Sequence, residues 1–237
     1  MKNCPPKGFL LIVLGFLSAT ALAAGCSATK VVPNPMVSHV HKVAVMPFVD
    51  MVAIYGENAS IRNSISGKVF ITGTVAQNAS QELTDQLIAM LENRFSYELI
   101  SPGQMMGVRS ELIAQSSIEI PEIRLITSAG KKLGADTVLI GHIYNYRERA
   151  GSPYAIESPA SVTFDLMMID TANERLIWSD EFQETQRSLG ENLLLLGKFI
   201  RRKGRWISAA EMASGGLKEM LDRLHRLQTA QEEAPKR

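Results

Sequence analysis

Cysteine is nearly absent from this sequence, which holds only Cys4 and Cys26. Cys4 lies in a segment that we expect to be removed, so the mature chain keeps one thiol and forms neither an internal disulfide nor a cysteine site for zinc. An excess of charge of one sign is also missing. The formal net charge is +1, so no global field draws the protein to nucleic acid. The fold must therefore depend on its apolar core, and 46% of the residues are hydrophobic.

Catalytic motifs are missing as well. The sequence has no Ser/His/Asp signature, no glycine loop that cradles phosphate and no zinc-protease helix motif. Asp165 and Asp170 are five positions apart on one predicted strand, so they point to opposite faces and do not make an acid/base pair. His39 and His41 share a strand face, as metal ligands can, but no third ligand is near in sequence. We therefore predict a protein that is not an enzyme and holds no metal and no cofactor, with His142 structural or exposed.

The amino-terminal segment has the parts of an export signal. A short cationic head precedes an apolar run over residues 9–24. A membrane-spanning helix needs about 20 apolar residues. This run is shorter and ends in small residues, so we predict a cleavable signal over residues 1–25.

The sequence Leu-Ala-Ala-Gly-Cys at residues 22–26 resembles the lipobox of bacterial lipoproteins. The resemblance implies cleavage between Gly25 and Cys26 and fatty acids, such as palmitate, on Cys26. One departure is Ala23, where leucine is more common. The alternative is an ordinary secretory signal that leaves a free thiol. Ser27 stands where aspartate would otherwise redirect sorting in Gram-negative cells, so the resemblance favours the outer membrane, with the body facing the periplasm.

Beyond Cys26 we predict a lipid-anchored tether at residues 26–39 and a single α/β domain at residues 40–228. We expect two insertions in this domain, one near residues 50–77, as a long loop or hairpin, and one near residues 188–205. Residues 229–237 are expected to form a disordered tail. A tether of about thirteen flexible residues spans about 20 Å on average. The body should therefore sit close to its membrane.

Hydrophobic periodicity and capping residues give the order of the elements. Helices are predicted from Asn78 (capped with Gln81), from Ser101, from Pro121 and from Ser208. The strand at residues 161–170 alternates apolar and polar residues, which indicates a half-buried strand, and it pairs with residues 176–185 as the clearest hairpin. The order β-α-β-α-α-β-β-β-α predicts an α/β (α+β) fold, a mixed sheet of about five strands packed by about four helices.

Three phrases carry a family resemblance: Val-Ala-Val-Met-Pro-Phe at 43–48, Leu-Gly-Ala-Asp at 133–136 leading into a strand, and a hairpin at 166–179 whose return strand holds Trp178 and Ser179. Together they resemble the superfamily that includes the curli-secretion channel lipoprotein, the lipoprotein activators of penicillin-binding proteins and the amino-terminal domain of the translocation protein TolB. The resemblance implies a fold and a compartment rather than a function. It also leads us to expect that Asp136 bonds a neighbouring backbone amide.

One segment combines apolar and basic side chains in a way that suits an interaction surface. It could pack on its own sheet, dock a partner protein or rest on lipid. Its basic cluster is too small and has too few aromatic neighbours for nucleic acid. The candidate residues are Leu193, Leu196, Phe199, Ile200, Arg201, Arg202, Lys203, Arg205 and Trp206.

The resulting hypothesis is a non-enzymatic, lipid-anchored module of the cell envelope that binds another envelope protein. The alternative is a subunit of an oligomeric outer-membrane secretion channel or ring, like the curli channel. A barrel strand needs about 9–11 alternating residues. The leucines at 193–196 are continuous, and residues 150–159 are too few for a spanning hairpin, so the alternative is the weaker one.

Overall fold

The computed structural model describes Val37 and residues 40–151, 156–186 and 207–233. The chain separates into two compact units, Met1–Pro33 and Asn34–Arg237. All described residues belong to the second unit.

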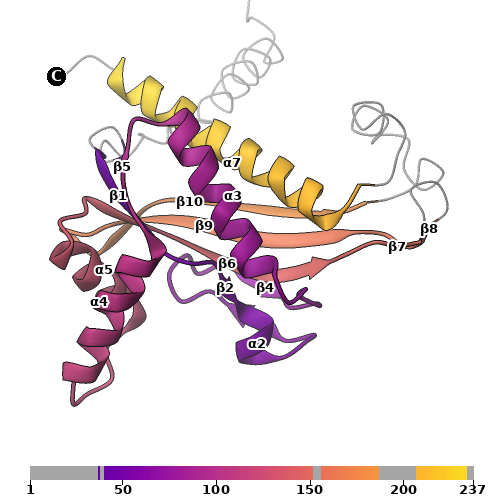
Figure 1. The fold of residues 1–237 in the computed structure, drawn as a ribbon, viewed down its shortest axis with the longest axis horizontal. Helices are drawn as coiled ribbons and strands as arrows, with labels where there is room; N and C mark the ends of the chain where they lie inside the picture. The colour runs from indigo at the N-terminus through magenta and orange to yellow at the C-terminus, as the bar shows by residue number, and fades with distance from the viewer. Residues whose placement is uncertain (1–36, 38–39, 152–155, 187–206, 234–237) are drawn as a thin grey trace, which may run out of the picture. The chain divides into compact units, whose positions relative to one another are not determined.

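A mixed six-stranded sheet forms the centre of this unit (Figure 1). Its strands are β1 (Lys42–Val45), β2 (Val49–Asp50), β5 (Glu98–Ile100), β6 (Thr137–Arg147), β9 (Ser161–Asp170) and β10 (Arg175–Thr185). Along the sheet the order is β10-β9-β6-β1-β5, and β2 pairs with β6. Strand β1 is parallel to both neighbours, whereas β6, β9 and β10 form an antiparallel meander.

Five helices accompany the sheet among the described residues: α2 (Met51–Tyr55), α3 (Ala79–Arg94), α4 (Pro102–Gln115), α5 (Glu122–Lys132) and α7 (Ala209–Glu232). Two small ribbons pair β3 (Ser60–Arg62) with β4 (Val69–Ile71), and β7 (Ala150–Gly151) with β8 (Ile156–Ser158). The principal elements follow the order β1-α3-β5-α4-α5-β6-β9-β10-α7. The predicted fold class and order of elements are therefore confirmed.

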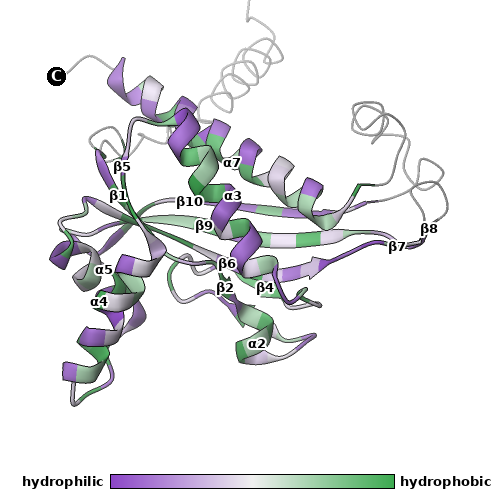
Figure 2. Cartoon of the chain, in the orientation of Figure 1, coloured by the Kyte–Doolittle hydropathy of each residue, from purple (hydrophilic) through white to green (hydrophobic). Residues whose placement is uncertain are grey.

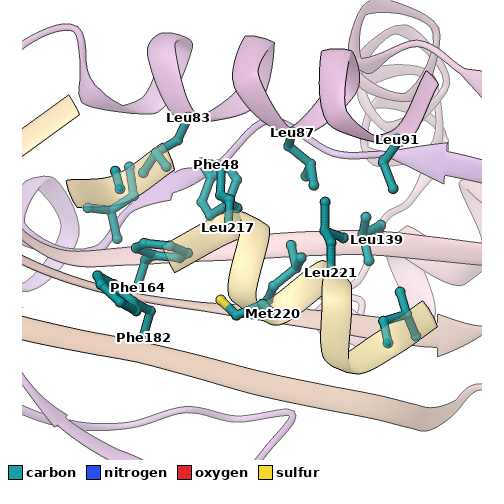
Figure 3. Close-up of a cluster of buried hydrophobic side chains, with 14 of the residues drawn as sticks. Phe48, Leu83, Leu87, Leu91, Leu139, Phe164, Phe182, Leu217, Met220 and Leu221 are labelled. Carbon is teal, nitrogen blue, oxygen red and sulfur yellow. The ribbon is translucent and has the colours of Figure 1, made fainter. Parts of the chain in front are cut away.

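Helices α3 and α7 cover one face of the sheet. Their leucines recur at three- and four-residue spacing, so each helix has one apolar stripe, and Figure 3 shows both stripes meeting over the strands. Full burial of each such side chain stabilises the fold by about 1.5–3 kcal/mol relative to exposure. The fully buried set includes Leu83, Leu87 and Leu91 of α3, Leu217, Met220 and Leu221 of α7, and Leu139 and Phe164 of the sheet.

Two groups of elements pack on the opposite face of the sheet. Helices α4 and α5 pack on one half, and the inserted segment with α2 and the β3–β4 ribbon packs on the other. Consequently all ten residues of β9 are buried, and the expectation of a half-buried strand is wrong. The alternation does occur, but its polar positions are covered: Asp165 bonds Asn63 of the inserted segment, and Ser161 bonds Asn145 and Thr185 of the neighbouring strands.

The capping box predicted at Ser208 is present, and the helix start predicted at Ser101 has one too. Ser101 and Ser208 each form a reciprocal capping box with the residue three positions on. The predicted cap at Asn78 is wrong: its side chain makes no capping bond, because its backbone (φ −98°, ψ 2°) is not extended. Its expected partner, Gln81, donates to Asp85 within α3 instead.

The structured body is longer at both ends than the predicted range 40–228. Val37 is only 3% exposed and belongs to the core, so the tether expected at 26–39 ends before it. Gln228 donates to the Val37 carbonyl (3.1 Å) and to the Tyr97 hydroxyl (2.6 Å), and burial raises the pKa of Tyr97 to about 12. These contacts keep α7 helical to Glu232, within the tail expected at 229–237.

Candidate interaction surface and the polar cluster beneath it

The inserted segment after β1 folds into α2 and the β3–β4 ribbon. Asp50 starts α2, because its carboxylate accepts from the amides of Val52 (2.8 Å) and Ala53 (3.1 Å). Gly56 ends it with a φ of +80°, a conformation that favours glycine. The chain then turns into an antiparallel ribbon that lies over β6.

The ribbon has a buried face and an exposed face, as alternation along strands requires. Ile61 and Phe70 are directly paired and turn inward, and Phe70 stacks on Tyr144 of β6 with ring centroids 3.9 Å apart. Arg62 and Val69 form the next pair and turn outward. The inward pair attaches the ribbon to the sheet, so the outward residues have a defined position.

Large apolar side chains gather on the outside of this segment. Ile54 is 59% exposed, Tyr55 56%, Val69 57% and Ile71 70%. Ile54 and Tyr55 line the same small cavity as Arg62, which is the cross-strand partner of Val69, so α2 and the ribbon share one surface. We call these four residues with Arg62 the insertion face. Figure 2 shows hydrophobic residues on α2, on the side of the sheet away from α3 and α7.

A buried polar cluster lies under the turn of the ribbon. Asp165 of β9 is 1% exposed, and its carboxylate accepts from the backbone amide of His142 (3.1 Å), the Tyr144 hydroxyl (2.9 Å) and the Asn63 side-chain amide (2.9 Å). His142 lies opposite Asp165 in the β6–β9 register, and its Nδ1 is 3.0 Å from the carboxylate. Asn63 also donates to the Tyr144 hydroxyl (3.0 Å).

These contacts define the tautomer of His142. A carboxylate only accepts, so at 3.0 Å Nδ1 carries the proton and donates to Asp165. The Asn63 amide nitrogen, which bonds Tyr144 and Asp165, also lies 3.2 Å from Nδ1. Burial, and secondly the Asp165 charge, raise the pKa of Tyr144 well above its usual range, so its hydroxyl remains a donor.

The same cluster holds the ribbon in register. The carbonyl oxygen of Asn63 accepts from the amides of Ile65 (2.8 Å) and Ser66 (2.9 Å), forming the turn between β3 and β4. One side chain thus closes the turn and bonds it to two strands of the main sheet. Because an unpaired buried carboxylate is costly, these bonds oppose any movement of the ribbon away from β9.

A cavity of about 80 Å³ opens beside the cluster. His142, whose Nδ1 is bonded to Asp165, is one of the residues that line this cavity. Ser64 and Glu122 line another part, and the Ser64 hydroxyl donates to the Glu122 carboxylate at 3.4 Å. The insertion face and the polar cluster therefore meet at this cavity.

The residues predicted from sequence as sites fall mainly outside the described residues. This applies to Gly25, Cys26 and the candidate surface at 193–206. His142, which was expected to be either structural or exposed, is buried and bonded to Asp165. Sequence reasoning missed the cluster itself. The available signal was that His142 and Asp165 interrupt otherwise apolar strands, but nothing in sequence linked either to Asn63.

The expected role of Asp136 is confirmed. Its carboxylate accepts from the backbone amides of His41 (2.9 Å) and Lys42 (2.8 Å), which ties the start of β1 to the start of β6. Within the described ranges, no group of three or more His, Cys, Asp or Glu residues could hold a metal ion.

Each end of α7 is bonded to a residue from a distant part of the sequence. At its carboxyl-terminal end, Gln228 holds Val37, where the chain enters from the tether. At its amino-terminal end, the Ile207 amide donates to the Gln186 side chain (2.9 Å). Residues 208 and 228 of this helix are about 30 Å apart at 1.5 Å per residue (Figure 1).

The fold places the chain among mixed α/β proteins in which helices and an inserted segment cover both faces of one sheet. Similar solved structures include PelC from Paraburkholderia phytofirmans, a dodecamer (14% identity, 78% of this chain and 89% of that chain, TM-score 0.44). A second is the LpoB carboxyl-terminal domain from Escherichia coli (16% identity, 62% of this chain and 84% of that chain, TM-score 0.37). A third is lipoprotein GNA1162 from Neisseria meningitidis (12% identity, 68% of this chain and 96% of that chain, TM-score 0.38). At these values the likeness carries no functional argument.

No family model and no curated protein matches the sequence. In the part of the chain that the structure describes, no helix has both the length and the apolar character needed to cross a bilayer.

Proposed function

We propose that this chain is a non-enzymatic, lipid-anchored interaction module of the Gram-negative cell envelope, held at the outer membrane through Cys26, which binds another envelope protein. The observation that carries the proposal is the insertion face. Four large apolar side chains that are each more than half exposed belong to one inserted segment, on α2 and strand β4. Contiguous exposed apolar surface of this kind marks interaction sites on soluble domains.

The attachment of the insertion face supports binding rather than a loose loop. The stacking of Phe70 on Tyr144 and the bonds of Asn63 hold the ribbon in one position before any partner arrives. A preorganised surface loses less conformational entropy when it binds, which favours affinity.

The geometry of the body also supports a protein partner. A tether of residues 26–36 spans about 17–20 Å on average, so the end of the body at Val37 stays near the bilayer. Gln186 and Ile207 are bonded at the other end of α7, about 30 Å away. The ribbon packs on Tyr144, in the half of β6 that is farther from Asp136. The insertion face therefore lies away from the end of the body at Val37, where a periplasmic partner would meet it.

The test is in-cell crosslinking followed by purification of the full chain. Ile71→Ser combined with Tyr55→Ser should lower the yield of the main crosslinked envelope protein about tenfold, equivalent to 1.4 kcal/mol. The matched control is Ile118→Ser, because Ile118 is 80% exposed but lies between α4 and α5. Equal yields from both variants would contradict the proposal for this face, and deletion of residues 193–205 tests the second candidate surface in the same way.

Two further measurements separate the parts of the proposal. Cys26→Ala should move the chain from the membrane to the soluble fraction and abolish incorporation of labelled palmitate. Mass photometry in detergent distinguishes a module from its alternative, since a discrete large ring would favour the channel or ring subunit over a module that binds a different protein.

A further inference from the structure

We propose that the cavity between His142, Ser64 and Glu122 is a pocket for an ammonium group, which a lysine side chain of the partner protein inserts when it docks on the insertion face. The inference rests on the proposed function for the source of the lysine. The pocket itself is argued from the described residues.

The cavity presents three acceptors. With Nδ1 of His142 as the donor to the buried Asp165, Nε2 of the neutral ring carries a lone pair on the opposite edge. Glu122 contributes a carboxylate, and the Ser64 hydroxyl has given its hydrogen to that carboxylate (3.4 Å), which leaves its lone pairs free. An ammonium has three N–H donors and no acceptor, so it matches this set group for group.

The size and walls of the cavity suit a lysine head. A volume of about 80 Å³ holds an ammonium with the methylenes nearest to it, because a single water needs only about 10–15 Å³ by the same kind of measure. Ile54 and Tyr55 form the apolar part of the wall. Lysine presents a compact charge on an apolar stem, so the stem would lie along these side chains while the head reaches the acceptors.

One lining residue opposes this ligand. Arg62 is cationic, but its Nη1 already donates to the Gly67 carbonyl (3.1 Å) in the turn of the ribbon. The amino-terminal end of α5 adds positive potential, which Glu122 in its first turn offsets. With Arg62 engaged elsewhere and three residues with acceptor atoms in the lining, the balance favours a cation over an anion.

The test uses small probes on the full chain. Amide spectra of ¹⁵N-labelled protein are recorded with n-butylammonium, with n-butanol and with pentanoate, at constant ionic strength because exposed charges are screened by salt. Butylammonium should give saturable shifts at Asn63, Ser64 and His142 that the other two probes do not give.

Two exposed positions then give effects of opposite sign. Glu122→Gln should weaken butylammonium binding about tenfold, because a charge-assisted bond is lost. Arg62→Gln should tighten it about threefold, because a like charge is removed. Neither side chain is part of the core, so both variants should retain wild-type spectra elsewhere.

Absence of saturable shifts would overturn the proposal. So would saturable binding of pentanoate that Arg62→Gln weakens, because that pattern describes an anion site. These outcomes are distinct from failure of the proposed function: if butylammonium does not bind but Ile71→Ser combined with Tyr55→Ser still lowers the yield of the crosslinked partner, only the lysine pocket is wrong.

Discussion

Changing Asn63 to aspartate tests whether the polar cluster holds the ribbon as described. The variant keeps the side-chain oxygen that accepts from Ile65 and Ser66, so the turn retains its bonds. It replaces the amide donor, 2.9 Å from the Asp165 carboxylate, with a second carboxylate. Two negative charges then face one another in a buried site, and a donor to Tyr144 is lost as well.

The magnitude follows from two competing terms. Unit charges 2.9 Å apart repel by about 6 kcal/mol at an effective dielectric constant of 20. Keeping one carboxyl protonated costs about 1.4 kcal/mol for each pH unit above its normal pKa, which is about 4 kcal/mol at pH 7. Protonation is the smaller cost, so the folded variant binds one more proton than its unfolded chain. The loss of stability is therefore about 4 kcal/mol at pH 7 and decreases as the pH falls toward 4.

Urea unfolding followed by circular dichroism at pH 5, 6, 7 and 8 measures this difference against the wild-type protein. The control is Asn58→Asp, the same chemical change at an exposed position of the inserted segment, where a φ of +59° is tolerated by aspartate. It should change stability little and without this pH dependence. A difference between Asn63→Asp and wild type that is equal at every pH would refute the shared-proton reasoning and the cluster geometry behind it.

Two further predictions concern packing. Gly215→Ala should stabilise the protein by about 0.5–1 kcal/mol, because an alanine suits a helix and its Cβ meets nothing within 4 Å. Gly216→Ala places a Cβ 2.5 Å from the Phe182 ring, so overpacking should lower the free energy of unfolding by about 1–3 kcal/mol. The Gly216 variant should therefore melt at a lower temperature than the Gly215 variant. A Gly216 variant as stable as the Gly215 variant would contradict the α7–β10 contact. Asp136→Ala should cost about 1–3 kcal/mol by leaving the amides of His41 and Lys42 without their acceptor, and urea midpoints would show it; an unchanged midpoint would contradict this.

The fold was largely predictable because its signals are local. The apolar stripe of α3 and the capping box at Ser208 depend on residues within a few positions of each other. Their order along the chain then gives the class of fold.

The candidate site was not predictable for the opposite reason. Asn63 meets His142 and Asp165 only because the inserted ribbon folds back over β6 and β9, and separations of 79 and 102 positions leave no pattern in sequence. The exposed apolar residues were equally hidden. Alternation showed that Val69 and Ile71 share a face, but which face is exposed was decided by the stacking of Phe70 on Tyr144.

The bond between Gln186 and Ile207 has an evolutionary consequence. Residues of the described domain bring Gln186 and Ile207 together. The two positions at which the intervening segment is attached therefore do not depend on the sequence of that segment. Closure entropy changes by only about 0.6 kcal/mol for each doubling of loop length. Descendants of this protein can therefore lengthen, shorten or replace residues 187–206 and acquire a new specificity while inheriting the same scaffold.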